Sequence, residues 1–349
     1  MYEEESISMS GWDLQNGSIT NYCPSEDYIW SLFNHVFSSS SAKANTYKFG
    51  LVKSILDNVF NGSVDGEGVF FTYTQIFARF AENYWNLVVR YNLRQMKPNK
   101  KSPFSKVEII LKEAAGNDPL SPHLEFSSLD AANQAQIIRK VTSECKRYVI
   151  GALYSDFDGV IYSFDLKKDG LTLSTKVYEF MLRYKSELEK LNYYAWAQFL
   201  EKVNDDSVVV HLLDKLDIAT PRRNNLSVYR EILRREFEEN TCFYCGRKLG
   251  NKVHVDHFIP WSFVKDDKLW NFVLACPTCN IKKNDRLPGS GFLERIQERN
   301  RTIKLSGDRI VRNDFICYTD DLLEKMWHYA KLSGLKEITD KSFSISSKF

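Results

Sequence analysis

The sequence predicts a mainly α-helical protein that carries a small α+β module towards its C-terminal end. Apolar residues recur at helical spacing in much of the first two thirds of the chain, for example over 47–60 and 72–96. Two Cys-x-x-Cys pairs then follow within a basic segment. Aromatic residues make up 14% of the 349 residues, which excludes a chain that is disordered over most of its length.

The first 220 residues are expected to form helices around one β-hairpin. Residues 151–173 predict the hairpin, because the runs GVIYSFDL and LTLS flank the turn KKDG. The segment 217–227 has the proline and polar residues typical of a linker. We therefore predict a helical domain of unknown role over 1–220, a second domain over 221–305 and a helical tail over 306–349. Helices are expected over residues 47–60, 72–96, 129–149, 174–191, 194–203, 227–240 and 319–332.

Charge is unevenly distributed along the chain. The net charge is only +2, but residues 221–305 contain 17 Lys and Arg against 10 Asp and Glu. A basic segment in an otherwise slightly acidic chain suggests a polyanionic partner. No apolar run approaches the roughly 18 residues that a membrane-spanning helix needs. The acidic start MYEEESISMSGWD lacks a secretory signal, so we expect a cytoplasmic protein with no membrane partner.

Four of the seven cysteines form the two Cys-x-x-Cys pairs, Cys242 with Cys245 and Cys276 with Cys279. Each pair places two thiolates on one side of a tight turn, and two such turns complete a tetrahedral site with four sulfur ligands. A closed set of this kind favours zinc and leaves no open position for catalysis. We therefore predict a structural Zn²⁺, with an iron–sulfur site or four free cysteines as the alternatives.

A second pattern lies between the two pairs and begins with VDHFIP at residues 255–260. Asn271 follows 14 residues after His257, and Asn280 directly follows the last cysteine. In this order the residues resemble the HNH (ββα-metal) endonucleases of the zinc-knuckle subclass. The stretch VDHFIPWSFVKDDKLWNFVL is also similar to the HNH domain of RNA-guided CRISPR effector nucleases. The resemblance covers residues 242–288 and does not extend to the rest of the chain.

The resemblance implies a unit of two strands and a helix, at 252–257, 272–276 and 277–286. It also implies metal-dependent hydrolysis of a DNA phosphodiester bond, in which His257 acts as the general base on water. This chemistry suits the residues, because a neutral histidine accepts a proton near pH 7. A divalent cation offsets the charge on the phosphate and on the leaving alkoxide.

The resemblance also assigns the remaining site residues. Asp256 and Asn280 match the ligands of a catalytic Mg²⁺, for which Mn²⁺ or another divalent ion can substitute. Because Asn280 stands where many relatives have His, the choice of metal stays open. Asn271 matches the residue that holds the loop bearing the base, and Lys283 matches a basic residue near the phosphate. His254 should share a strand face with Asp256, where it is either a further metal ligand or a solvated residue.

The implied partner is DNA. One site of this class cuts one strand, so a double-strand break needs a homodimer or successive nicks. The class suggests restriction or anti-phage defence, in which the helical domain senses a trigger or binds a protein partner. A homing or mobile-element nuclease and a non-catalytic, zinc-stabilised DNA-binding subunit are the alternatives. Arg230 and Arg234 are candidates for phosphate contacts, since they lie four apart on a predicted helix, and Asn284 is a candidate second metal ligand.

Overall fold

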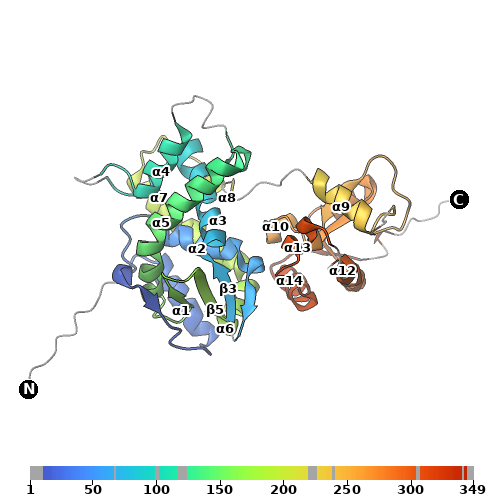
Figure 1. The fold of residues 1–349 in the computed structure, drawn as a ribbon, viewed down its shortest axis with the longest axis horizontal. Helices are drawn as coiled ribbons and strands as arrows, with labels where there is room; N and C mark the ends of the chain where they lie inside the picture. Colours follow the sequence, from blue (N-terminus) through green and yellow to red (C-terminus); the bar gives the residue numbers. More distant parts are fainter. Residues whose placement is uncertain are drawn as a thin grey trace, which may run out of the picture. The chain divides into compact units, whose positions relative to one another are not determined.

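The computed structural model shows a chain that divides into two compact units (Figure 1). Unit 1 comprises residues 1–181 and 187–221, and unit 2 comprises residues 182–186 and 222–349. The predicted fold class is confirmed, because helices dominate and the strands form small sheets. No helix in the described part of the chain is both long and apolar enough to cross a bilayer. The structure describes residues 11–66, 68–98, 102–116, 124–218, 226–237, 240–303, 307–339 and 342–343, so the middle of the predicted linker (219–225) lies outside the described residues.

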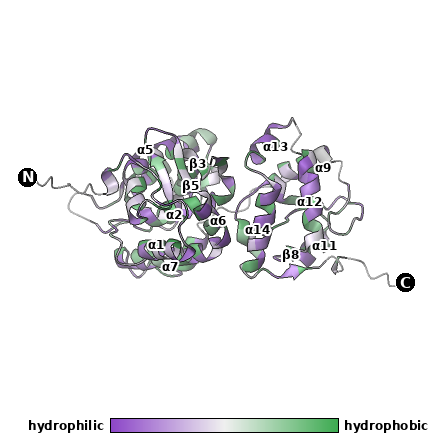
Figure 2. Ribbon diagram, turned by 90° about the horizontal axis from the view of Figure 1, so that it is seen from below, coloured by the Kyte–Doolittle hydropathy of each residue, from purple (hydrophilic) through white to green (hydrophobic). Residues whose placement is uncertain are grey.

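Unit 1 is organised around one long helix, α5 (Ala131–Asp156), which Asp130 caps at its N-terminus. Helices α2 (Tyr47–Asp57), α3 (Tyr73–Trp85) and α4 (Lys106–Ala115) all pack against α5 (Figure 1). Their apolar residues form an aromatic-rich core. Hydrophobic and hydrophilic residues alternate along the helical ribbons of both units in Figure 2. The other helices described before residue 219 are η1 (Gly11–Asp13), α1 (Glu26–Phe37), η2 (Val59–Asn61), η3 (Asn86–Arg90), η5 (Phe126–Ser128), α6 (Thr175–Arg183), α7 (Lys185–Val203) and α8 (Leu212–Ile218).

An antiparallel sheet of five short strands completes unit 1, in the order β1-β4-β5-β3-β2. Its centre contains the predicted hairpin, in which Phe164 of β4 pairs with Leu171 of β5. The other three strands were not predicted, because segments of two to five residues are too short to show a clear alternation of apolar and polar residues. The strands are β1 (Asn16–Gly17), β2 (Ser63–Asp65), β3 (Gly68–Thr72), β4 (Tyr162–Asp165) and β5 (Gly170–Ser174).

Three predicted boundaries before residue 219 are wrong. The helices predicted over 174–191 and 194–203 are instead separated at residue 184, between α6 and α7, and Asn192 stays inside α7, where its side chain donates to the Phe49 carbonyl at 3.1 Å. Residues 151–156 belong to the end of α5 and not to the hairpin. Gly151 does not break the helix, because it is the point where α5 approaches the backbone of Gly11, and a Cβ there would meet the Gly11 oxygen at 2.3 Å. The helix predicted over 72–96 ends earlier, since α3 continues only as a short π-helix over Asn86–Arg90 and Asn92 adopts a left-handed backbone conformation.

Unit 2 contains a two-stranded sheet, β6 (His254–His257) with β7 (Phe272–Ala275), and helix α11 (Pro277–Lys283). The other elements of unit 2 are α9 (Ser227–Phe237), α10 (Trp261–Val264), η6 (Leu269–Asn271), β8 (Leu287–Pro288), α12 (Ser290–Ile303), α13 (Arg309–Asp314), α14 (Asp320–Leu332) and β9 (Glu337–Ile338). The last of these elements pack on the earlier ones, because α14 contacts α12 and β9 pairs with β8.

Candidate active site and metal centre

The candidate site is built on β6, β7 and α11. The two strands are antiparallel, with His254 opposite Ala275 and His257 opposite Phe272. Side chains alternate between the faces of a strand, so His254 and Asp256 share one face and His257 points to the other. Helix α11 contacts β6 and begins with a proline at its first turn, where the missing N–H is not needed.

The four cysteines of the two Cys-x-x-Cys pairs meet at one point. The sulfur atoms of Cys242, Cys245, Cys276 and Cys279 all lie within 4.8 Å of one another. A tetrahedral zinc with Zn–S bonds of about 2.3 Å places its sulfurs roughly 3.8 Å apart. The donor set and its spacing therefore fit a zinc ion, and the convergence of the four sulfurs favours a metal site over four unrelated free cysteines.

The first pair lies on a tight turn that the backbone holds in place. Gly246 donates its N–H to the Cys242 carbonyl at 2.8 Å, and it has a φ of +70°, which favours glycine. Burial raises the pKa of the Cys242 thiol. Burial also acts to raise the pKa of Cys245, but hydrogen bonds from Arg247, Cys242 and Cys279 together stabilise its thiolate and lower this pKa to about 6. Zinc binding must therefore displace protons from the buried thiols.

His257, the predicted general base, is almost fully enclosed. Its side chain is 5% exposed, and its Nε2 lies 2.9 Å from Oδ1 of Asp267, which is equally buried. The imidazole packs edge-on against the rings of Trp261 and Phe272. These contacts fix the ring in one orientation and leave Nδ1 as the nitrogen that Asp267 does not engage.

Asn271 links the segment after β6 to the start of β7. Its side chain accepts the Ile259 N–H at 2.8 Å and donates to the Ile259 carbonyl at 3.0 Å. Its backbone carbonyl accepts the Phe258 N–H at 2.7 Å. The residue is fully buried, so these bonds form away from water and hold the backbone that follows His257.

Asp256 is held by two buried partners. The hydroxyl of Tyr244, which lies inside the first cysteine turn, donates to Oδ2 of Asp256 at 2.5 Å. The ammonium group of Lys283 lies 3.3 Å from the same oxygen and donates to the His257 carbonyl at 2.7 Å. Burial, together with the negative charge of Asp256, raises the pKa of Tyr244 well above its usual range, so the hydroxyl remains a donor.

The position of Lys283 differs from the sequence-based expectation of a residue beside the phosphate. Its side chain is 1% exposed and faces the end of β6. The structural reason is its place on α11, four residues after the buried Cys279, on the buried face of the helix. Lys283 therefore neutralises Asp256 and holds the backbone of His257.

His254 and Asn280 lie together at the solvent side of the site. The amide nitrogen of Asn280 approaches Nδ1 of His254 to 3.0 Å, and the His254 side chain is exposed. Asn284 comes one turn later, where the helix ends, and its backbone has a φ of +47°. The carboxylate of Asp256, the amide of Asn280 and the imidazole of His254 thus provide oxygen and nitrogen donors on one face of β6 and α11.

Sequence reasoning missed two residues at this site, Asp267 and Tyr244. Both were visible in the sequence, as the second acid of the KDDK run and as the residue before Cys245. Their spacing from the motif gave no signal, because the loops between the elements decide which side chains meet. It also missed α12, whose Arg299 donates to the Phe272 carbonyl and whose Asn300 donates to the Trp270 carbonyl at 2.9 Å.

Comparison with known families agrees with this geometry. Residues 242–289 match the family model of the HNH endonucleases. No curated protein and no solved structure matches the chain. The recognition of an HNH endonuclease segment with a zinc-knuckle cysteine cluster is confirmed, and this family supports a nuclease that binds nucleic acid. The similarity to the HNH domain of RNA-guided CRISPR effectors stays a prediction.

Proposed function

We propose that the chain is a metal-dependent endonuclease that hydrolyses phosphodiester bonds in DNA. The observation that carries the proposal is the buried pair of His257 and Asp267. His257 directly follows Asp256 on β6. Helix α11 contacts this strand, and its partner strand β7 leads directly into Cys276 of the four-cysteine cluster. A non-catalytic zinc module has no need of a histidine that a carboxylate orients in this way.

His257 is the residue that takes the proton from the attacking water. A carboxylate at Nε2 favours the tautomer whose proton lies on Nε2, since that N–H can then donate to Asp267. The Nδ1 atom is left with a free lone pair and can accept a proton. Asn271 supports this arrangement indirectly, because it fixes the backbone after His257.

Asp256 and Asn280 are the residues that would hold the catalytic divalent cation, and His254 is a third donor beside them. Carboxylate and amide oxygens are the ligands that Mg²⁺ and Mn²⁺ prefer. A bound cation supplies charge compensation for the phosphate and the leaving oxygen. Tyr244 and Lys283 hold Asp256 from the protein side, which leaves the carboxylate with a defined orientation.

DNA as the substrate and a role in restriction or anti-phage defence are the finer parts of the proposal. The supporting observations are the excess of Lys and Arg over residues 221–305 and the exposed Arg234 on α9, near the first cysteine pair. A single site cuts one strand, so a homodimer, successive nicks or a partner protein would complete a double-strand break. A homing or mobile-element nuclease would use the same chemistry.

The products of a plasmid reaction test this function. Supercoiled plasmid incubated with the protein and Mg²⁺ should give relaxed circles that DNA ligase reseals, because hydrolysis by this family leaves a 3′-hydroxyl and a 5′-phosphate. A parallel reaction with a structured RNA distinguishes the substrates. Retention of plasmid in a gel shift, without cleavage under Mg²⁺ or Mn²⁺, would support the non-catalytic DNA-binding alternative instead.

A further inference from the structure

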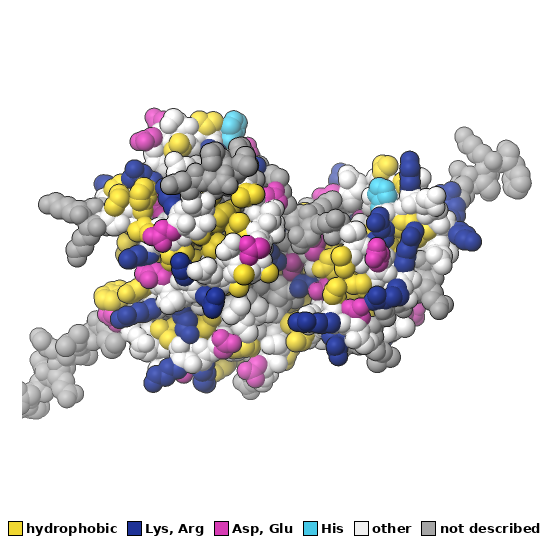
Figure 3. Space-filling view, turned by 45° about the horizontal axis from the view of Figure 1, so that its top comes forward, with side chains coloured by type: hydrophobic (Ala, Val, Ile, Leu, Met, Phe, Trp, Pro, Cys, Tyr) yellow, Lys and Arg dark blue, Asp and Glu magenta, His cyan; other side chains and the backbone are white. Residues whose placement is uncertain are grey.

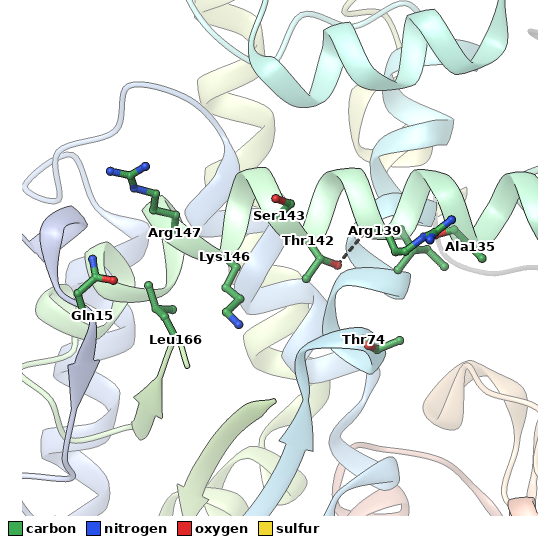
Figure 4. Close-up of a pocket in the computed structure, with 10 residues that line it drawn as sticks. Gln15, Thr74, Ala135, Arg139, Thr142, Ser143, Lys146, Arg147 and Leu166 are labelled. Carbon is green, nitrogen blue, oxygen red and sulfur yellow. Dashed lines mark hydrogen bonds between the residues drawn. The ribbon is translucent and has the colours of Figure 1, made fainter. Parts of the chain in front are cut away.

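Unit 1 contains a groove of about 600 Å³ along α5 (Figure 4). Two of its polar side chains are bonded to carbonyls of their own helix, because Thr142 donates to Ile138 at 2.7 Å and Arg139 donates to Ala135 at 3.4 Å. Lys and Arg side chains are spread over both units in Figure 3, with Asp and Glu side chains among them. Surface charge therefore does not single out a ligand, whereas a set of buried contacts in unit 2 points to a function.

The side chain of Tyr244 has two ends with different surroundings. Its hydroxyl donates to Oδ2 of Asp256 at 2.5 Å, and Asp256 is the carboxylate proposed to hold the catalytic cation. Its ring lies 4.7 Å from the ring of Phe343, centroid to centroid, and the two planes are only 15° apart. Phe292 of α12 meets the same ring edge-on at 5.5 Å. The residue that orients Asp256 is therefore itself held between two aromatic rings.

Phe343 belongs to a C-terminal segment that is tied to the end of the nuclease motif. The Leu287 N–H donates to the Lys336 carbonyl at 3.0 Å, and the Gly289 N–H donates to the Ile338 carbonyl at 3.1 Å. These bonds make β9 a neighbour of β8, which directly follows the motif helix region. The segment is thus anchored close to Phe343 in sequence.

The ring of Phe343 is enclosed in unit 2. It is 4% exposed, and it packs edge-on against Phe292 at 5.5 Å. Both residues lie outside 242–289, the range that matches the HNH family model. The motif residue Tyr244 is therefore covered by rings that the motif does not supply.

We propose that Phe343 is a positioning residue for the catalytic divalent cation. It acts through Tyr244: the Phe343 ring holds the Tyr244 ring in place, and the Tyr244 hydroxyl then fixes the carboxylate of Asp256. The C-terminal segment is thus part of the nuclease site, although it lies outside the motif. This inference rests on the proposed function, because it requires that Asp256 holds the cation.

The physical reason is the control of a ligand by its hydrogen-bond partner. Loss of a residue that hydrogen-bonds a metal ligand commonly weakens metal binding about 10–100-fold, because the ligand is no longer oriented. Removal of the Phe343 ring leaves a cavity beside Tyr244. The Tyr244 ring can turn into this space, and water can compete with Asp256 for its hydroxyl.

A second contact limits the size of the effect. The ammonium group of Lys283 lies 3.3 Å from the same oxygen of Asp256, and it reaches this oxygen from α11. This contact does not involve Phe343. Loss of the Phe343 ring should therefore weaken cation binding and not abolish it.

The test measures Mn²⁺ binding by the full chain at one equivalent of zinc and without DNA. Free Mn²⁺ is quantified from its electron paramagnetic resonance signal, and the binding that Asp256→Asn removes defines the site. The variants are Phe343→Ala, Tyr244→Phe and the double variant. The matched control is Phe315→Ala, since Phe315 is equally buried and packs on Tyr318 at the end of α13.

Phe343→Ala should bind Mn²⁺ about tenfold more weakly, at the lower end of the range for such partners. Tyr244→Phe should lose at least as much. The double variant should bind no more weakly than Tyr244→Phe, because two residues that act through one contact are not additive. Phe315→Ala should match the wild type. If Phe343→Ala does not fold, Phe343→Leu should show a smaller loss, which should likewise disappear in the Tyr244→Phe background.

The Mg²⁺ dependence of plasmid nicking provides a second readout. Phe343→Ala should need about tenfold more Mg²⁺ to reach half of its maximal rate. At saturating Mg²⁺ it should cleave at the wild-type rate, because the pair of His257 and Asp267 is unchanged. A purely structural role for Phe343 would instead lower the maximal rate and leave the Mg²⁺ requirement unaltered.

Three results would overturn the inference. The first is equal Mn²⁺ affinity of Phe343→Ala and the wild type. The second is a double variant in which the two losses multiply, which would show that Phe343 does not act through Tyr244. The third is an equal loss in Phe315→Ala, which would indicate general destabilisation. A wild type that binds no Mn²⁺ at Asp256 would overturn the proposed cation site as well, so the two failures are distinguishable.

Discussion

Asp267→Asn is the substitution that separates an oriented catalytic histidine from a merely buried one. The change preserves the size and shape of the side chain but replaces an acceptor oxygen with an amide group that can donate. The Oδ1 atom of Asp267 lies 2.9 Å from Nε2 of His257, and both side chains are about 95% buried. An amide donor at this place favours the tautomer with its proton on Nδ1, and the lone pair that accepts the proton from water is lost.

The expected loss is the contribution of a general base, a factor of 10² to 10⁴ in the rate of cleavage. At 1.36 kcal/mol for each factor of ten, this corresponds to roughly 2.7–5.4 kcal/mol of activation free energy. The assay is single-turnover nicking of supercoiled plasmid at saturating Mg²⁺. Zinc content and DNA binding without metal should be unchanged, because Asp267 is buried beside His257 and is not one of the four cysteine ligands.

Asp266→Asn is the matched control. Asp266 is also buried and directly precedes Asp267, but its carboxylate accepts the Asp267 N–H at 3.0 Å and lies 3.7 Å from the Lys268 ammonium group. Its substitution should alter the cleavage rate far less than that of Asp267. The reasoning would be refuted if Asp267→Asn cleaved within twofold of the wild type, or if both variants lost activity equally.

Three further predictions concern stability. Tyr244→Phe removes one buried hydrogen bond to the charged Asp256, so it should lower the free energy of unfolding by about 2 kcal/mol, measured with urea; no change would contradict the bond. Burial raises the pKa of the Cys279 thiol, so bound zinc should be released as the pH falls, which a chromogenic zinc indicator would record; pH-independent retention would contradict this. Asp57→Ala leaves Lys53 charged and buried in unit 1 and should cost about 3–5 kcal/mol. Burial lowers the pKa of Lys53, but its interactions with Asp57, Tyr193 and Glu189 together raise this pKa by more. The stabilisation is therefore present below the ordinary lysine pKa and is lost only as the pH rises through the raised value. Thermal unfolding at neutral pH checks the cost of the substitution, and an unchanged midpoint would oppose it.

The parts of the site that could be predicted from sequence are those set by short-range geometry. The Cys-x-x-Cys turns bring their own thiols together, and a strand places His254 and Asp256 on one face whatever surrounds it. The strands predicted at 252–257 and 272–276 are within two residues of β6 and β7. Asp267 could not be assigned in this way, because it reaches His257 through a loop whose course depends on tertiary packing.

The same limit applies to unit 1. The long helices α3 and α5 follow from apolar periodicity, whereas the five-stranded sheet depends on pairing between segments far apart in the chain. For example, Phe71 of β3 lies opposite Leu171 of β5, a hundred residues later. Local propensity gives no information on such a pair. Lys283 is a similar case, because a lysine on an amphipathic helix is usually exposed and its burial is decided by what it meets across β6.

The measurement that tests the central claim most directly is metal-dependent cleavage by wild type and His257→Ala at equal zinc occupancy. Both proteins are brought to one equivalent of zinc, incubated with supercoiled plasmid, and assayed with Mg²⁺, with Mn²⁺ and without divalent metal. We expect nicking by the wild type only when Mg²⁺ or Mn²⁺ is present, and a rate at least 10²-fold lower for His257→Ala. Nicking by His257→Ala at the wild-type rate would contradict the assignment of His257 as the base.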